Sequence, residues 1–117
     1  MSTVVAKEPT SSPRAKSHAV VRVFEEERSS VVHVVGELDI ASSDRLESVL
    51  RTLAQRSHGR VVVDLSRVTF MDSAGLRVLV RARERMDAGG RWLLTRGATG
   101  QPRRLLEIGR IRYGLAL

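Results

Sequence analysis

The sequence contains no cysteine and very few aromatic residues. Without a thiol, the chain has no disulfide, no thiolate nucleophile and no cysteine-ligated metal. One Trp, one Tyr and two Phe in 117 residues mean that Val, Leu and Ile have to build the hydrophobic core. At 42% hydrophobic residues, a single domain of this length can bury such an aliphatic core. The shortage of rings also argues against a base-stacking platform for nucleic acid.

Long apolar runs and clusters of catalytic or metal-ligating side chains are absent too. Every apolar run is shorter than the ~18 residues of a spanning helix, and no secretory signal is visible, so we predict a cytoplasmic protein without membrane contact. The three histidines are scattered, which predicts no metal site. Asp39, Asp64 and Asp72 have no His, Cys or phosphate-cradling glycine loop beside them. We therefore predict no enzyme activity, no catalytic residue and no cofactor.

Positive charge is abundant and unevenly distributed. The net charge is +7, yet residues 1–75 carry ten basic and ten acidic residues. Residues 76–117 carry ten Arg against three acidic residues, so the whole excess lies in the C-terminal third. A basic patch is the electrostatic signature of nucleic-acid binding. A nucleic-acid-binding module that uses the arginines from Arg77 to Arg112 is therefore the alternative function, although no known binding motif accompanies them.

The N-terminal segment differs in composition from the rest of the chain. Residues 1–17 are rich in Ser, Thr, Pro and Lys without apolar periodicity, which predicts a disordered tail before a domain at 18–117. Apolar and polar residues alternate over 19–25, and residues 31–38 are mostly apolar, so each range is predicted to be a strand. The charged turn between the two ranges is short. Such a turn predicts that the two strands pair antiparallel.

The middle of the chain alternates helices and strands. Apolar residues at spacings of three and four predict a helix over about 43–56, closed by Gly59. The β-branched run from Val61 predicts a buried strand that ends near Ser66, followed by a small apolar anchor at Val68 and Phe70. A second amphipathic helix is predicted after Ser73 and ends at Gly89-Gly90.

The C-terminal third predicts three more elements. Residues 92–94 read as a strand, residues 102–109 as a helix that ends at Gly109, and residues 111–117 as a last strand. The order β-β-α-β-α-β-α-β predicts an α/β fold with a mixed, mainly parallel sheet and its helices on one face. A final strand at a sheet edge would expose unpaired backbone groups, so we expect weak homodimerisation there.

Ser73 lies where the buried strand gives way to the second helix. Asp72 or Ser73 is the natural N-cap, and unpaired N–H groups with the helix dipole can accommodate an anion at this point. Functional loops of such sheets gather beyond the carboxyl ends of the parallel strands. Asp39 and the turn from Met71 to Gly75 both fall at that end. From the local residues alone, Ser73 reads as either a simple cap or a modified residue.

Two motifs resemble those of a known family. Gly36-Glu37-Leu38-Asp39 follows the second strand, and Val62-Val63-Asp64-Leu65 precedes Phe70-Met71-Asp72-Ser73-Ala74-Gly75-Leu76. Together they resemble the STAS domain of bacterial anti-sigma factor antagonists over about residues 19–115. The chain departs from that family in Ala74, where many relatives carry a second hydroxyl residue, and in its expected lack of a helix after the last strand.

The resemblance implies a phosphorylation switch in transcription regulation, in settings such as the stress response and sporulation. Ser73 matches the serine that an anti-sigma factor with ATP-dependent kinase activity phosphorylates, and a phosphatase removes the phosphate. It implies that the unmodified protein binds the anti-sigma factor and frees a sigma factor without contacting nucleic acid. The implied partner-binding residues are Glu37, Asp39, Ile40, Thr69, Met71, Asp72, Ser73, Ala74, Gly75 and Leu76.

Overall fold

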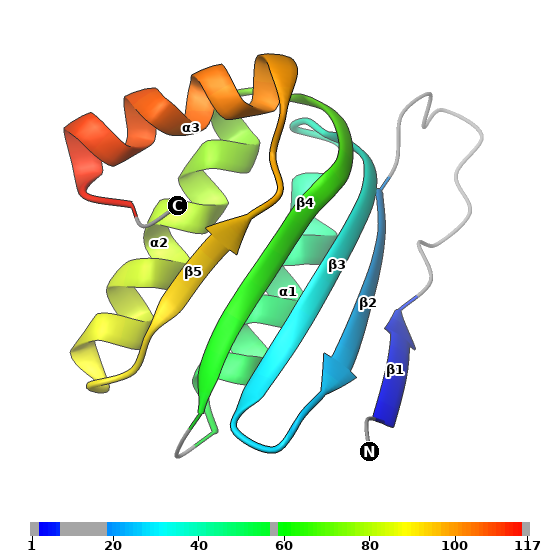
Figure 1. Cartoon of the computed structure of the whole chain (residues 1–117), viewed down its shortest axis with the longest axis vertical. Helices are drawn as coiled ribbons and strands as arrows, with labels where there is room; N and C mark the ends of the chain where they lie inside the picture. Colours follow the sequence, from blue (N-terminus) through cyan, green and yellow to red (C-terminus); the bar gives the residue numbers. More distant parts are fainter. Residues whose placement is uncertain (1–2, 8–18, 57–58, 116–117) are drawn as a thin grey trace.

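A five-stranded mixed sheet forms the centre of the protein. The computed structural model describes residues 3–7, 19–56 and 59–115. The strands lie in sequence order across the sheet; the first two pairs of neighbouring strands are antiparallel and the last two pairs are parallel (Figure 1). They are β1 (Thr3–Lys7), β2 (Ala19–Glu25), β3 (Ser29–Leu38), β4 (Arg60–Met71) and β5 (Leu93–Arg96). The predicted α/β fold with a mixed sheet is confirmed.

Two helices cover one face of this sheet. The helices are α1 (Ser43–Ala54), α2 (Ser73–Ala88) and α3 (Gly100–Tyr113). In Figure 1, α1 and α2 lie behind the sheet, and α3 extends from the upper end of β4 toward the upper left. Strand residues that point toward α1 and α2, such as Val32, Val63 and Leu65, are fully buried. As the composition predicted, the core cluster consists of aliphatic residues and methionine.

Strand β4 is longer than predicted. It continues past Ser66 to Met71, and its pairing with β3 shifts register twice, between His33 and Val35 and again between Gly36 and Glu37. A register shift changes which side chains of a strand face solvent, so polar residues can be exposed at the shift while later apolar residues still face the core. Ser66 and Arg67 are exposed, whereas Met71 is fully buried. The strand therefore runs directly to the start of α2.

The predicted last strand at residues 111–117 is wrong, because α3 continues through Gly109 to Tyr113. Gly109 is a packing residue: a Cβ there would lie 2.7 Å from Leu76 Cδ1. The helix ends at Gly114, whose φ of 69° is the left-handed conformation that favours glycine. Leu115 then turns back into the core with 1% exposure. The edge expected to drive homodimerisation is therefore absent from the described residues, and the chain does carry a terminal helix.

The N-terminal segment also differs from the prediction. Residues Thr3–Lys7, expected to be disordered, form strand β1 and pair antiparallel with β2 from Thr3–Glu25 to Lys7–Val21. The remainder of the predicted tail, residues 1–2 and 8–17, lies outside the described residues. The composition of residues 1–17 gave no sign of this pairing because its partner strand lies further along the chain.

Candidate functional site

Ser73 is the first residue of α2, and its hydroxyl is available. Asp72 is the N-cap, and its Oδ1 accepts hydrogen bonds from Ala74 N at 2.8 Å and Gly75 N at 3.2 Å. Of the two predicted cap residues, Asp72 therefore does the capping. Ser73 is exposed and makes no hydrogen bond through its side chain within the described part of the chain. The hydroxyl can thus be modified without loss of the cap.

The turn after β3 lies directly beside this helix start. Asp72 Oδ2 accepts a hydrogen bond from Ile40 N at 3.2 Å, and Asp72 N donates to Leu38 O at 3.0 Å. Parallel pairing brings Leu38 and Met71, the last residues of their strands, opposite each other. The predicted proximity of the Asp39 turn and the Met71 to Gly75 turn is therefore present in the structure.

Asp39 organises the turn that carries Ile40. Its Oδ1 accepts hydrogen bonds from Ala41 N and Ser42 N, both at 3.0 Å, and from Ser42 Oγ at 3.1 Å. The backbone N–H of Asp39 donates in return to Ser42 Oγ at 3.0 Å. This arrangement is an Asx turn, in which a side-chain carboxylate replaces backbone partners. It leaves Ile40 with 79% of its surface exposed.

Two buried contacts hold the start of α2 in place. A Cβ on Gly75 would lie 3.0 Å from both Leu38 O and Met71 Cγ, so only glycine fits there without a shift. On the other side, Gln101 Nε2 donates to Met71 O at 2.6 Å, and Gln101 Oε1 accepts from Met71 N at 2.9 Å. Sequence reasoning missed Gln101, because no local pattern connects the first turn of α3 with the end of β4.

The predicted site residues divide by exposure into two groups. Those with surface to offer a partner are exposed or half-buried: Glu37, Asp39, Ile40, Thr69, Asp72, Ser73 and Ala74. Met71, Gly75 and Leu76 are buried, with 0% of Met71 and 7% of Leu76 exposed, so these residues position the turn instead. Phe70, expected to be an apolar anchor, is 41% exposed and adds an apolar group opposite Glu37 in the strand register.

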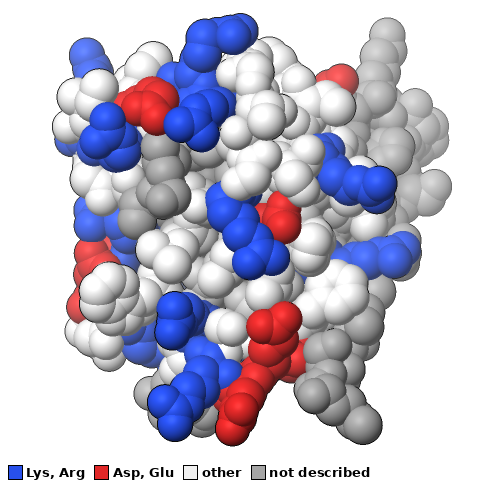
Figure 2. Space-filling view, viewed as in Figure 1, with Lys and Arg blue, Asp and Glu red and all other residues white. Residues whose placement is uncertain are grey.

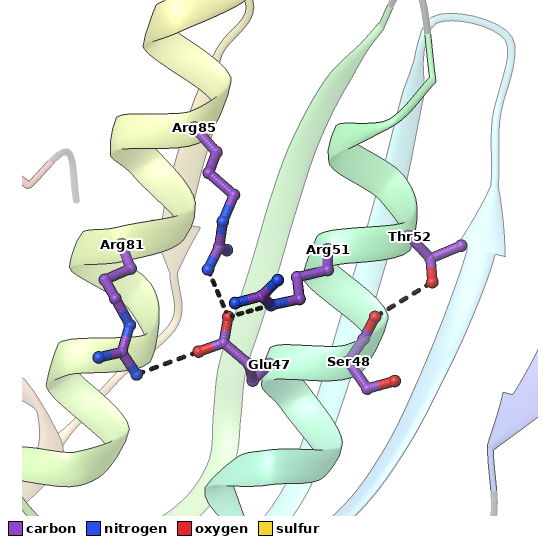
Figure 3. Close-up of polar contacts among 6 residues, drawn as sticks. All are labelled: Glu47, Ser48, Arg51, Thr52, Arg81 and Arg85. Carbon is purple, nitrogen blue, oxygen red and sulfur yellow. Dashed lines mark hydrogen bonds and ion pairs between the residues drawn. The ribbon is translucent and has the colours of Figure 1, made fainter.

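A salt-bridge cluster fixes α1 against α2 (Figure 3). Glu47 Oε1 pairs with Arg81 at 3.1 Å, and Glu47 Oε2 pairs with Arg85 at 2.7 Å and Arg51 at 3.2 Å. Burial raises the pKa of Glu47, but the hydrogen bonds from Arg85 and Arg81 outweigh it and lower the pKa below its ordinary value. Because both site turns lead into these helices, the cluster stabilises their relative position.

Most of the C-terminal arginines already have partners. Arg81 and Arg85 pair with Glu47, Arg83 with Asp87, Arg96 with Asp64, and both Arg103 and Arg110 with Glu107, whereas Arg91 binds backbone carbonyls. Only Arg77, Arg104 and Arg112 lack such a contact in the described ranges. Fewer arginines between Arg77 and Arg112 are therefore available to bind phosphates, which argues against the alternative function of nucleic-acid binding through them.

No group of three or more His, Asp or Glu side chains within residues 3–7, 19–56 and 59–115 is placed to hold a metal ion. None of the helices in these ranges combines the length and the hydropathy required for a membrane span.

The sequence and the fold match one family of proteins. The family profile described as "Mlab, STAS domain" matches residues 21–113. The chain is 34% identical over 77 residues to an anti-sigma-B factor antagonist of Staphylococcus aureus, covering 66% of this chain and 71% of the relative. The chain therefore belongs to the STAS domain family and, within it, to the anti-sigma factor antagonists.

Solved structures agree with this assignment. An anti-sigma factor antagonist from Mycobacterium paratuberculosis matches with a TM-score of 0.67 and 28% identity, over 92% of this chain and 90% of that one. The Bacillus cell fate determinant SpoIIAA in its phosphorylated form matches with a TM-score of 0.65, over 76% of this chain and 82% of that one. At 16% identity, the second likeness concerns the fold.

Proposed function

We propose that this protein binds an anti-sigma factor through the surface around Ser73, and that phosphorylation of Ser73 abolishes this binding. The unmodified protein frees a sigma factor and permits transcription. The anti-sigma factor is itself the ATP-dependent kinase, and a separate phosphatase restores the unmodified form. In this scheme the protein is a substrate of both enzymes and catalyses no reaction.

One observation carries the proposal: the Ser73 hydroxyl is exposed, has no partner among the described residues, and lies at a helix start that a different residue caps. A phosphate there would meet the positive dipole end of α2, which tolerates negative charge. The helix therefore survives the modification.

The binding surface combines an apolar contact with fixed negative charge. Ile40 and Phe70 supply exposed apolar area, and Glu37, Asp39 and Asp72 supply carboxylates on the adjoining turns. Phosphorylation adds about −1.5 to −2 charges to this acidic surface. A partner surface shaped for a neutral hydroxyl would then face both steric bulk and like-charge repulsion, so the complex would dissociate.

Co-purification from the native cell tests the modification itself. The protein is captured with its partners, and mass spectrometry locates phosphate by residue, with Ser73→Ala as the matched control. We expect phosphate on Ser73 and an ATPase-type anti-sigma factor in the captured material. Phosphate confined to other serines in both proteins would overturn the assignment of Ser73.

A further inference from the structure

The end of the molecule opposite Ser73 carries a basic groove. Three segments meet there, at the amino ends of β4 and β5: the turn before β3, Gly59 with Arg60 at the start of β4, and the connection from α2 to β5 (Figure 1). The groove has a volume of about 500 Å³. Its lining residues are Arg28, Gly59, Arg60, Gly89, Gly90, Arg91 and Trp92.

Hydrogen bonds hold the Arg91 side chain in place among the residues that line this groove. Its guanidinium group donates to Gly59 O at 3.0 Å, Leu53 O at 2.9 Å, Ala54 O at 3.1 Å and Arg56 O at 2.7 Å. The carbonyl groups at the end of α1 are thereby tied to the connection that leads into β5. Backbone hydrogen bonds join the three segments further, from Arg60 N to Arg28 O at 3.1 Å and from Val61 N to Trp92 O at 2.9 Å.

The rim presents two free cations and one aromatic ring. Arg28 and Arg60 are exposed, and neither side chain has a hydrogen bond or ion pair in the part of the chain that the structure describes. This distinguishes them from the seven partnered arginines of the C-terminal third. Trp92 has 70% of its surface exposed, although tryptophan is a residue that normally buries most of its ring.

The residues that line the groove are basic or uncharged, whereas Glu26 and Glu27 are exposed acids that precede Arg28 in the turn before β3. No carboxylate is among its lining residues, although Figure 2 shows acidic groups beside the basic ones at the lower edge of the molecule. Guanidinium groups match the oxygens of a phosphate in a fork geometry, and an exposed indole face offers a surface on which a planar base stacks. A positively charged groove with an aromatic ring is the usual design for single-stranded nucleic acid.

We propose that this groove binds single-stranded nucleic acid, with a base stacked on Trp92 and the flanking phosphates on Arg28 and Arg60. This site differs from the C-terminal arginines that the sequence singled out. The scarcity of aromatic residues in the chain does not oppose it, because one ring is enough to stack one base. The site lies at the far end of β4 from Ser73, so it can be filled while that surface holds a protein partner.

The chain contains a single Trp, so intrinsic fluorescence reports directly on the groove. The full-length protein is titrated with a single-stranded oligonucleotide of about eight nucleotides at increasing salt. We expect quenching of Trp92, and a slope of log K against log salt of about −1.4 for two phosphate contacts. Arg28→Gln and Arg60→Gln should each reduce the slope to about −0.7. Arg104 on α3 likewise has no partner among the described residues, and Arg104→Gln should leave the slope unchanged.

Anisotropy of a dye-labelled oligonucleotide extends the test to variants without the ring. Trp92→Ala should weaken binding of the oligonucleotide about tenfold. An abasic strand with the same phosphates should bind the unmodified protein more weakly by a similar factor. Equal binding of the abasic strand, equal quenching by an acidic peptide, or an equal effect of Arg104→Gln would overturn the proposal. Ser73→Asp should bind the strand as tightly as the unmodified protein, which separates this proposal from the phosphorylation switch. Melting curves establish that each variant is folded.

Discussion

Asp72 and Ile40 are joined by a hydrogen bond of 3.2 Å from the backbone N–H of Ile40 to Asp72 Oδ2. The other carboxylate oxygen of Asp72 caps α2. A single side chain therefore connects the helix start that carries Ser73 with the turn that exposes Ile40. Because both turns belong to the proposed partner surface, the Asp72 side chain adds to the backbone contacts that hold this surface as one unit.

Replacing Asp72 should separate these two roles. Asp72→Asn keeps an oxygen for the cap but turns an amide group toward Ile40 N, so only the connection to the turn is lost. Asp72→Ala loses both and should cost about 1 to 2 kcal/mol of unfolding free energy. Hydrogen exchange measures the difference: Ile40 should exchange faster in both variants, and Ala74 and Gly75 only in Asp72→Ala. Unchanged exchange at Ile40 would contradict the connection.

Asp39 should prove structural as well as functional. Because its carboxylate accepts three hydrogen bonds within the turn, Asp39→Ala should lower stability by about 1 to 2 kcal/mol, measured by denaturant unfolding. Asp39→Asn retains an acceptor oxygen and should stay close to the parent protein in stability while removing the charge. If the Asn variant also binds the anti-sigma factor normally, the charge of Asp39 has no part in recognition.

The Glu47 cluster should make stability depend on pH. The pKa of folded Glu47 is below its ordinary value of 4.5, so the unfolded chain takes up this proton first as the pH falls. The contribution of Glu47 is therefore complete above about pH 4.5 and is lost as the pH drops through the folded value. Glu47→Gln should be about 1 to 2 kcal/mol less stable at pH 7. This difference should shrink in acid, and a difference independent of pH would rule out ionic pairing as its cause.

Replacing Arg91 should lower the free energy of unfolding more than replacing any other arginine. Arg91→Ala removes the donor for four backbone carbonyl groups at the end of α1 and in the following connection, which should cost about 2 to 3 kcal/mol. Arg104→Ala is the matched control, and it should change stability by less than about 0.5 kcal/mol because its side chain lacks a described partner. Equal melting temperatures for the two variants would contradict this role of Arg91.

The parts of the fold that follow local patterns were predictable from the sequence. The apolar stripe at Leu46, Val49, Leu50 and Leu53 predicts the buried side of α1, and these residues are buried. Asp72 and Ser73 mark the start of α2, because short polar side chains precede an apolar run. The meeting of the Asp39 turn with the Ser73 turn follows from parallel pairing of β3 and β4, which itself follows from the intervening helix.

The features that the sequence did not predict depend on contacts between segments that are distant in the chain. Ile111 and Tyr113 favour a strand locally, but Gly109 packs against Leu76 and keeps α3 helical until Gly114. The extension of β4 to Met71 depends on register shifts against β3 that no period-two pattern encodes. Gln101 reaches Met71 across thirty positions of sequence. Tertiary packing overrides local propensity in each case, which is why these features required the structure.

The affinity of the cognate anti-sigma factor for Ser73 variants tests the central claim most directly. Calorimetric titration should give Ser73→Ala an affinity within about threefold of the unmodified protein, because Asp72 and not Ser73 caps α2. Ser73→Asp should bind at least about tenfold more weakly, because it adds a charge to an acidic surface. Both variants should melt close to the parent protein. Equal affinities for Ser73→Ala and Ser73→Asp would contradict a switch at Ser73.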